Sequence, residues 1–455
     1  MAIEPLRHLA PTSAPVPHRA EPPATPTVQI DPARIRELTA RESERLDART
    51  QGSAAAYERA KRSLVGGVSS SYQKRAPWPI YLDRGQGQYV WDVDGHQYLD
   101  VHNGIGSMVQ GHAHPLITEA VDRRIRLGSH FAAPTEDTYI VAEHLAARWG
   151  LPRWRFVNSG SEATMDAIRL ARGATGRDGV MKIFGSYHGH HDYVMVDIGL
   201  SVYDGKDREN YPSIAYGKGI PDSVSQMTTA VPFNDAGVLE RRLTALQSEG
   251  RLPACLIMEA AMMNCGVILP EPGYLADVRR ITKKFGVVWI VDEVKTGLNV
   301  AAGGATELFG IKPDLVCLAK ALGAGIPTGA IGGSDEMWAM VDSGDVYMVG
   351  TFNGNPLAMA AARANLERVM TPDAYKHLGR LNDQLLDGAQ GIIDRYKLAA
   401  YAVGIQSKGV ITFAQSKVVD YDSYKSAQQK EIIDLVWLWN MNRGIFGTPG
   451  RDEEW

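Results

Sequence analysis

Two residues of opposite charge, Asp292 and Lys320, each end a short apolar run of the sequence. The runs span 287–291 and 315–319 and are rich in β-branched side chains. Such runs are typical of strands that are buried on both faces of a parallel sheet. The carboxyl ends of parallel strands meet at one edge of a sheet, where α/β proteins bind their ligands, so we expect the acid and the lysine there. Either residue alone would more often be a solvated loop residue or a helix cap. Together they predict a chemical site.

Small residues surround Lys320 in the sequence. Ala319 and Ala321 flank it, and the run 322–330 contains mostly glycine, alanine and other small side chains. Small residues allow other groups to approach closely and leave room for a flat ring. A lysine in such apolar and crowded surroundings loses its charge easily and can form a Schiff base with a carbonyl group.

Three motifs carry a resemblance to a known family. The runs 292–297 (Asp-Glu-Val-Lys-Thr-Gly), 319–323 (Ala-Lys-Ala-Leu-Gly) and 350–357 (Gly-Thr-Phe-Asn-Gly-Asn-Pro-Leu) resemble the class III, fold-type I pyridoxal phosphate (PLP) enzymes. Within that family the chain is most similar to glutamate-1-semialdehyde aminomutase and related aminotransferases. The resemblance implies that Lys320 carries PLP as an aldimine and that Asp292 keeps the ring nitrogen of PLP protonated.

The expected fold is α/β, in four parts. The resemblance implies a fold-type I transferase, in which a large domain holds a mostly parallel, seven-stranded sheet between helices and both chain ends form a small α/β domain. Residues 1–30, rich in Pro and Ala, are expected to be a disordered extension because they offer little apolar area to bury. The remaining parts are N-terminal helices and a piece of the small domain (31–110), the large PLP-binding domain (111–365) and the C-terminal small domain (366–455).

Local signals mark two elements near the start of the chain. A helix is expected to begin at Asp31-Pro32, where a cap acceptor precedes a proline at the first helical position. Asp94-Gly95 interrupts an alternating apolar pattern over 89–100, which predicts a β-hairpin.

A small-residue turn, Ser159-Gly160-Ser161, lies between an expected strand at 154–157 and an expected helix. A helix N-terminus in this position can bind an anion through its unpaired N–H groups, although most turns of this kind only cap a helix. The resemblance assigns the turn to the cofactor phosphate. It also implies catalytic roles for Lys320, Asp292 and Tyr187, and it places these further residues at the cofactor: Tyr187 and Val294 against the two ring faces, with His188, Glu259, Asn264 and Thr351.

Two departures from the aminomutase pattern affect the expected substrate. Gln73 follows the run 66–72, which includes Ser70, where the aminomutase has an arginine that holds the substrate carboxylate. Glutamine cannot offer a charged, two-pronged hydrogen bond, although Lys74 or Arg75 could replace it. Ile105 stands where the aminomutase has an aromatic residue over the substrate. We therefore expect Ser70, Gln73 and Ile105 to contact a different amino or carbonyl compound.

The leading functional interpretation is an aminotransferase that moves an amino group from a donor to a carbonyl acceptor through the Lys320 aldimine and pyridoxamine phosphate. The alternatives are an intramolecular aminomutase or a racemase and, from another class, a non-catalytic protein that has kept the fold. A metal site is not expected. No third ligand is visible near His112 and His114, and the resemblance already explains Tyr187 and His188 in the run 187–192, although that run has four possible metal ligands.

Composition narrows the expected partners. The net charge of −4 gives no reason to expect binding to nucleic acid or to an anionic membrane. Cys255, Cys265 and Cys317 lie in or beside apolar runs and are expected to be reduced thiols of a cytoplasmic protein. The remaining expected partners are small-molecule amines and carbonyl compounds. The resemblance implies a homodimer in which the Thr351 loop reaches the cofactor phosphate of the neighbouring subunit.

Overall fold

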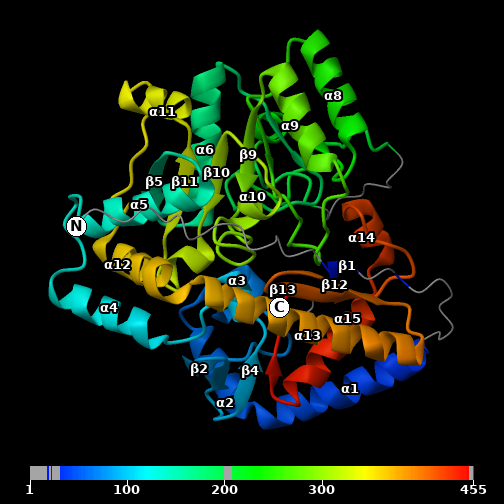
Figure 1. Cartoon of the computed structure of the whole chain (residues 1–455). Helices are drawn as coiled ribbons and strands as arrows, with labels where there is room; N and C mark the ends of the chain where they lie inside the picture. The colour runs from blue at the N-terminus through cyan, green and yellow to red at the C-terminus, as the bar shows by residue number, and fades with distance from the viewer. Residues whose placement is uncertain (1–17, 20–21, 23–30, 199–206, 450–453) are drawn as a thin grey trace.

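A seven-stranded sheet forms the centre of the protein (Figure 1). The structure is a computed structural model that describes residues 18–19, 22, 31–198, 207–449 and 454–455. The strands, in spatial order, are β5 (Arg153–Val157), β11 (Gly329–Gly333), β10 (Leu315–Leu318), β9 (Val288–Asp292), β8 (Cys255–Met258), β6 (Val180–Ile183) and β7 (Thr228–Val231). β11 is antiparallel to both of its neighbours, and the other pairs are parallel. The predicted α/β class and mostly parallel sheet are confirmed.

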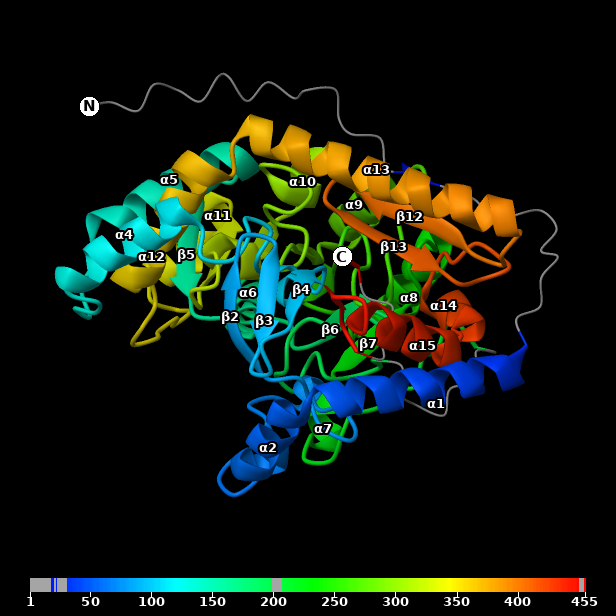
Figure 2. The ribbon, with the colours of Figure 1, turned by 90° about the horizontal axis from the view of Figure 1, so that it is seen from below.

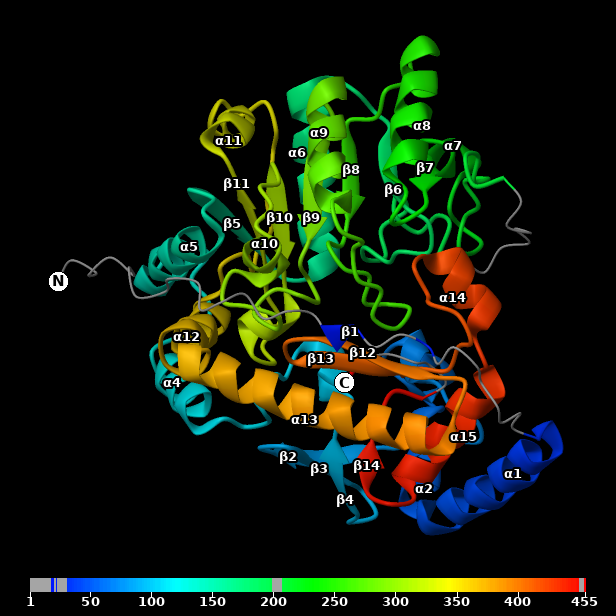
Figure 3. The same cartoon turned by 45° about the vertical axis from the view of Figure 1, so that its right-hand side comes forward.

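Helices cover both faces of this sheet (Figure 3). The alternation of side chains along a strand sends Ile290 to one face and Trp289 to the other. Ile290 packs in the cluster with α6 (Gly160–Thr175) and α11 (Asp335–Asp342). Trp289 packs in the cluster with α8 (Ala236–Ser248) and α9 (Tyr274–Phe285). The helices α5 (Glu136–Trp149) and α12 (Pro356–Ala364) pack against β5, β10 and β11, and α4 (Pro115–Arg126) lies against α12.

Two smaller sheets lie below the central one in Figures 1 and 3. The first contains β1 (His18–Arg19), β12 (Tyr401–Ile405) and β13 (Lys408–Thr412), and α13 (Pro372–Tyr396) packs on it. The second contains β14 (Ile445–Phe446), β4 (Gln97–Asp100), β3 (Tyr89–Asp92) and β2 (Leu82–Gln86). Further helices are α2 (Gln51–Ala60), α3 (Asn103–Gly106), α7 (Asp222–Ser225), α10 (Gly304–Leu308) and α14 (Tyr421–Ala427).

Segments from near the two ends of the chain meet in this lower part. The helix α1 (Pro32–Arg49) packs along α15 (Lys430–Met441), as Figure 2 shows from below. Glu42 on α1 is buried, and its side chain accepts a hydrogen bond of 2.9 Å from Asn442. A buried carboxylate must be hydrogen-bonded or paired, so this contact fixes the first long helix on the last one.

Both local predictions for the start of the chain are confirmed. Asp31 accepts a hydrogen bond of 2.9 Å from the N–H of Ala33 and caps α1, which begins at Pro32. β3 and β4 pair as an antiparallel hairpin around Asp94-Gly95. The predicted disordered extension, 1–30, lies mostly outside the described residues. Where it is described, His18–Arg19 form the edge strand β1, which pairs with β12.

Candidate active site

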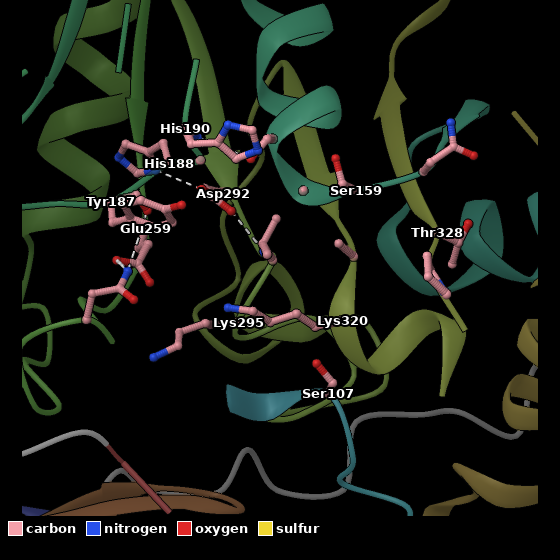
Figure 4. A pocket seen from close by; sticks show the side chains of 18 of the residues that line it. Ser107, Ser159, Tyr187, His188, His190, Glu259, Asp292, Lys295, Lys320 and Thr328 are labelled. Carbon is pink, nitrogen blue, oxygen red and sulfur yellow. Dashed lines mark hydrogen bonds and ion pairs between the residues drawn. The ribbon is translucent and has the colours of Figure 1, made fainter. Parts of the chain in front are cut away.

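A cavity of about 450 Å³ opens at the carboxyl ends of the central strands (Figure 4). Most of the residues predicted to bind the cofactor line it: Ser159, Gly160, Ser161, Tyr187, His188, Glu259, Asn264, Asp292, Val294 and Lys320. A cavity of this size can hold a small organic cofactor together with part of a substrate. The structure thus brings together residues that are far apart in the sequence.

Lys320 follows β10 and begins a short 3₁₀ turn, Lys320–Gly323. Its backbone has φ of +46°, a left-handed conformation that is uncommon for a residue with a side chain and that is found most often at functional sites. Burial lowers the pKa of the Lys320 amine to about 8, and the positive charge of Lys295 acts in the same direction. The neutral amine, which is the form that attacks a carbonyl group, is therefore far more populated near neutral pH than in an ordinary lysine.

Asp292 ends β9 and is 4% exposed. One carboxylate oxygen accepts a hydrogen bond of 2.7 Å from Nδ1 of His188, and the other accepts one of 2.9 Å from the N–H of Val294. Burial lowers the pKa of His188, which favours the neutral ring as the donor. The two hydrogen bonds fix the direction of the carboxylate, which can hold a proton on a ring nitrogen placed against it.

The turn before α6 forms the opposite wall of the cavity. Ser159 caps the helix by accepting a hydrogen bond of 3.2 Å from the N–H of Glu162, and the Ser161 hydroxyl accepts one of 3.2 Å from the N–H of His190. A Cβ atom on Gly160 would lie 2.9 Å from both γ-carbons of Val294, so only glycine fits there without a shift. The helix dipole and the N–H groups of the first turn favour an anionic group at this wall.

Glu259 and Asn264 form a second polar group in the cavity, beside Tyr187 (Figure 4). The Asn264 amide donates to Glu259 Oε2 at 3.4 Å and to the carbonyl oxygen of Tyr187 at 3.5 Å. Burial, together with the negative charge of Asp292, raises the pKa of Glu259 to about 8. Glu259 is therefore mostly protonated at neutral pH, so it can donate a hydrogen bond as well as accept one.

Four predicted site residues lie elsewhere. Thr351 does not line this cavity; it lies in the loop between α11 and α12. Ser70 and Gln73 are exposed and bond to each other, with the Ser70 N–H 3.1 Å from Gln73 Oε1. Ile105 lies in α3 with φ of +57° and is not a lining residue. Within this chain, Ser70, Gln73 and Ile105 do not line the cavity that holds Lys320, and their contact with a substrate stays a prediction.

Lys74 and Arg75, the suggested replacements for the missing arginine, also lie outside the cavity that contains Lys320. Arg75 and Gln73 line a separate cavity of about 410 Å³. There the Arg75 guanidinium lies 4.7 Å from the ring centre of Trp437 and donates to the carbonyl oxygen of Trp78 at 3.1 Å. Lys74 is not among the residues that line the Lys320 cavity.

Sequence reasoning gave no role to Lys295, which lines the cavity three positions after Asp292. Its ammonium pairs with Glu454 at 3.0 Å. The signal for Lys295 was its place in the same strand-end run as Asp292. Nothing local pointed to Glu454, because only the fold brings the two residues together. Lining residues such as Ser107 and Thr328 had no motif either.

The donor set fits PLP, a flat anionic aldehyde. The Ser159–Ser161 turn offers N–H groups for a phosphate, and the buried Asp292 offers a charge partner for a ring nitrogen. Lys320 offers an amine whose pKa is already low. Nε2 of His188 is buried and has no hydrogen-bond partner among the described residues, so the His188 ring has a polar atom to spare for a bound group.

Two further observations concern metals and membranes. Among the described residues, no three His, Cys, Asp or Glu side chains lie together as they would around a metal ion. No helix in the described ranges combines the length and the apolar character that crossing a membrane requires. All three cysteines are buried and free of disulfide bonds.

Comparisons with known proteins agree with this geometry. The family model for class-III aminotransferases matches residues 70–428. A glutamate-1-semialdehyde 2,1-aminomutase from Methanocaldococcus jannaschii is 38% identical over 399 residues, which is 87% of this chain and 91% of that protein. The solved glutamate-1-semialdehyde aminomutase of Pseudomonas aeruginosa PAO1 has a TM-score of 0.85 at 30% identity and covers 93% of this chain and 94% of its own. A transaminase solved with PLP bound has a TM-score of 0.78 at 29% identity, covering 89% and 92% of the two chains.

Proposed function

This chain belongs to the class-III aminotransferase family of PLP-dependent enzymes, and we propose that it moves an amino group from an amine donor to a separate carbonyl acceptor. The observation that carries the proposal is the pair of strand-end residues, Asp292 and Lys320, which line one cavity with a helix N-terminus opposite. Their presence also argues against the alternative of a non-catalytic protein that has kept the fold.

When bound, PLP supplies an electron sink that stabilises negative charge at the substrate carbon. Asp292, held by His188 and by the N–H of Val294, keeps a proton on the ring nitrogen. The Lys320 amine would hold the cofactor through its aldehyde carbon and, when free, would accept and return a proton at the substrate carbon. The turn Ser159–Ser161 would bind the phosphate, and Tyr187 and Val294 would contact the ring.

An aminomutase is the second candidate, and a specific observation favours it. The relatives from Methanocaldococcus jannaschii and Pseudomonas aeruginosa are named glutamate-1-semialdehyde aminomutases. Against it stands the 66–73 segment, which has Gln73 where an arginine was expected and lies outside the cavity. We therefore place amino transfer between two molecules first. Amino transfer within one molecule and racemisation, which inverts the amine-bearing carbon of one molecule, come second.

An isotope experiment separates these candidates. The holoenzyme is incubated with a ¹⁵N-labelled amine donor and an unlabelled keto acid, and the products are analysed by mass spectrometry. The proposal predicts ¹⁵N in the aminated keto acid. An aminomutase would leave the acceptor unlabelled and would isomerise glutamate-1-semialdehyde with no second substrate present. A racemase would invert the donor without forming a carbonyl product.

We propose in addition that the enzyme is a cytoplasmic homodimer in which Thr351 contacts the cofactor phosphate of the partner subunit. The loop around Thr351 supports this arrangement because it exposes large apolar side chains. Tyr347 is 75% exposed, Val349 70% and Phe352 55%. Apolar side chains gathered on one loop are typical of a protein interface. The partners that this proposal requires are otherwise small-molecule amines and carbonyl compounds.

A further inference from the structure

Lys295 is a cavity-lining lysine that the proposed chemistry does not use. It lies in the turn after β9, and its side chain is 3% exposed. In Figure 4 its side chain lies beside that of Lys320, below Asp292. Lys320 binds the cofactor, and Asp292 faces the ring nitrogen, but no part of the cofactor requires a second lysine. A buried charge is costly unless it is paired, so a lysine at this place calls for an explanation.

The ammonium of Lys295 contacts oxygen atoms from two distant parts of the chain. It donates to the carbonyl oxygen of Met263 at 2.9 Å and to Oε2 of Glu454 at 3.0 Å. The Glu454 side chain is 2% exposed. Trp455 anchors this segment, since its N–H donates to Gly409 at 3.0 Å and its ring N–H donates to Asn382 at 2.8 Å. Lys295 therefore already forms an ion pair with a carboxylate from a distant part of the chain, Glu454.

The cavity contains cationic side chains that can bind an anionic ligand, beside the negatively charged Asp292. Among the described residues that line the cavity, the lysines are Lys295 and Lys320, and there is no arginine. Glu259 carries little negative charge at neutral pH, because burial raises its pKa to about 8. Glu454 is not itself a lining residue, so Lys295 is the member of the pair that faces the cavity. Arg75, which was also considered as a partner for a substrate carboxylate, instead contacts the ring of Trp437 and donates a hydrogen bond to Trp78.

We propose that Lys295 binds the carboxylate of an amino-acid or keto-acid substrate and that Glu454 is the internal counter-ion with which this carboxylate competes. This inference rests on the proposed function and narrows it, since it restricts the preferred substrates to acids rather than simple amines. Charge-assisted hydrogen bonds between an ammonium and a carboxylate are about twice as strong as neutral ones, so Lys295 distinguishes an acid from its uncharged analogue. Lys295 is a specificity residue for the substrate and does not act on the bonds that change.

Binding of unreactive ligands tests the inference without turnover. Calorimetric titration of the holoenzyme uses two matched pairs, 3-phenylpropionate with 3-phenylpropanamide and hexanoate with hexanamide, none of which carries an amine or a keto group. We expect the wild-type enzyme to prefer each carboxylate. Lys295→Met should weaken carboxylate binding about 10-fold or more and leave amide binding unchanged within about 2-fold, whereas Lys295→Arg should keep the preference. Glu454→Gln should tighten carboxylate binding because it removes the competing charge.

A second variant guards against loss of folding. Lys295→Met leaves Glu454 buried without its partner, so the double variant Lys295→Met/Glu454→Gln is titrated alongside it, and the PLP content of every variant is measured by absorbance. The double variant should lack the carboxylate preference. The inference is overturned by equal affinities for acid and amide in the wild type, by a preference that survives in both Lys295→Met variants, or by weaker carboxylate binding in Glu454→Gln.

The outcome is independent of the test of function. If no donor transfers ¹⁵N to an acceptor but the carboxylate preference depends on Lys295, the aminotransferase proposal fails and the assignment of Lys295 stands. If ¹⁵N is transferred but the ratio of carboxylate affinity to amide affinity is the same in Lys295→Met and in the wild type, the aminotransferase proposal stands and the assignment of Lys295 fails.

Discussion

Nδ1 of His188 donates a hydrogen bond of 2.7 Å to Oδ2 of Asp292, and both side chains are buried. His188 follows β6 and Asp292 ends β9, so the contact joins two strands of the central sheet at the edge where the cavity opens. The histidine adds no charge when its ring is neutral, and burial lowers its pKa. It therefore leaves the negative charge of Asp292 available to the cofactor while fixing the carboxylate in place.

Replacing Asp292 should cost far more activity than replacing His188. Asp292→Asn keeps the shape but removes the charge that holds a proton on the ring nitrogen, so we expect the rate of cofactor amination by a donor to fall about 100-fold or more. His188→Phe keeps a flat ring but removes the hydrogen bond to Asp292, and it should lower the rate about 10-fold. Stopped-flow absorbance on single turnovers measures both, with PLP content as the control. Equal losses in the two variants would contradict this division of roles.

The location of Asp292 and Lys320 could be predicted from the sequence because each residue lies at the end of its own strand. Asp292 and Lys320 come directly after apolar runs, and the parallel sheet aligns their ends, so local pattern and topology were sufficient. The cap at Asp31 and the hairpin at Asp94-Gly95 were also local features.

Contacts between distant segments could not be predicted in this way. Glu454 reaches Lys295 only because Trp455 docks on β13, and no pattern near either residue indicates that contact. Position 73 shows the same limit. The resemblance aligns it with an arginine that binds substrate in the aminomutase, and only the fold shows that Gln73 lines a separate cavity with Trp437.

The pH dependence of PLP attachment should report the low pKa of Lys320. The amine attacks the aldehyde only when it is neutral, and burial lowers its pKa to about 8. For the apoenzyme, the rate of covalent PLP attachment should therefore rise with pH and level off above about pH 8, rather than near the usual lysine value of about 10.4. In Lys295→Met the midpoint should move to higher pH, because a neighbouring positive charge is lost. Borohydride trapping followed by peptide mass analysis at each pH measures attachment, and a label on another lysine would contradict the assignment.

A methyl group at position 160 should weaken cofactor binding. The added Cβ of Gly160→Ala would lie 2.9 Å from both γ-carbons of Val294, which must then move into the space beside the ring. Overpacking of this kind costs about 1–3 kcal/mol, so we expect the Kd for PLP to rise about 10-fold.

Two variants test the reason for that loss. Gly160→Ala/Val294→Ala should recover most of the affinity because the clash is removed. Gly237→Ala is the matched control in the first turn of α8, where the new Cβ would meet only the end of the Arg241 side chain, at 3.2 Å, and the Asp235 side chain, at 3.4 Å. PLP affinity is measured by fluorescence titration of the apoenzyme. A loss in the double variant as large as that in Gly160→Ala would show that Val294 is not the cause.

Hybrid dimers can show whether Thr351 acts on its own site or on that of its partner. Thr351 lies outside the cavity of its own chain, in a loop whose neighbours Val349 and Phe352 are exposed. Thr351→Val removes a hydroxyl that can bond to phosphate, so the homodimeric variant should bind PLP about 10-fold more weakly.

A hybrid of one Thr351→Val subunit and one Lys320→Ala subunit separates the two arrangements. In this hybrid, the one remaining Lys320 belongs to the Thr351→Val subunit, and the one remaining Thr351 belongs to the Lys320→Ala subunit. If Thr351 acts across the interface, PLP affinity at that lysine should equal the wild-type value, and affinity as low as in the Thr351→Val homodimer would place the threonine at its own site instead. Differently tagged subunits allow the hybrid to be purified, and light scattering checks that each sample is a dimer. A wild-type protein that is entirely monomeric would contradict the proposed homodimer.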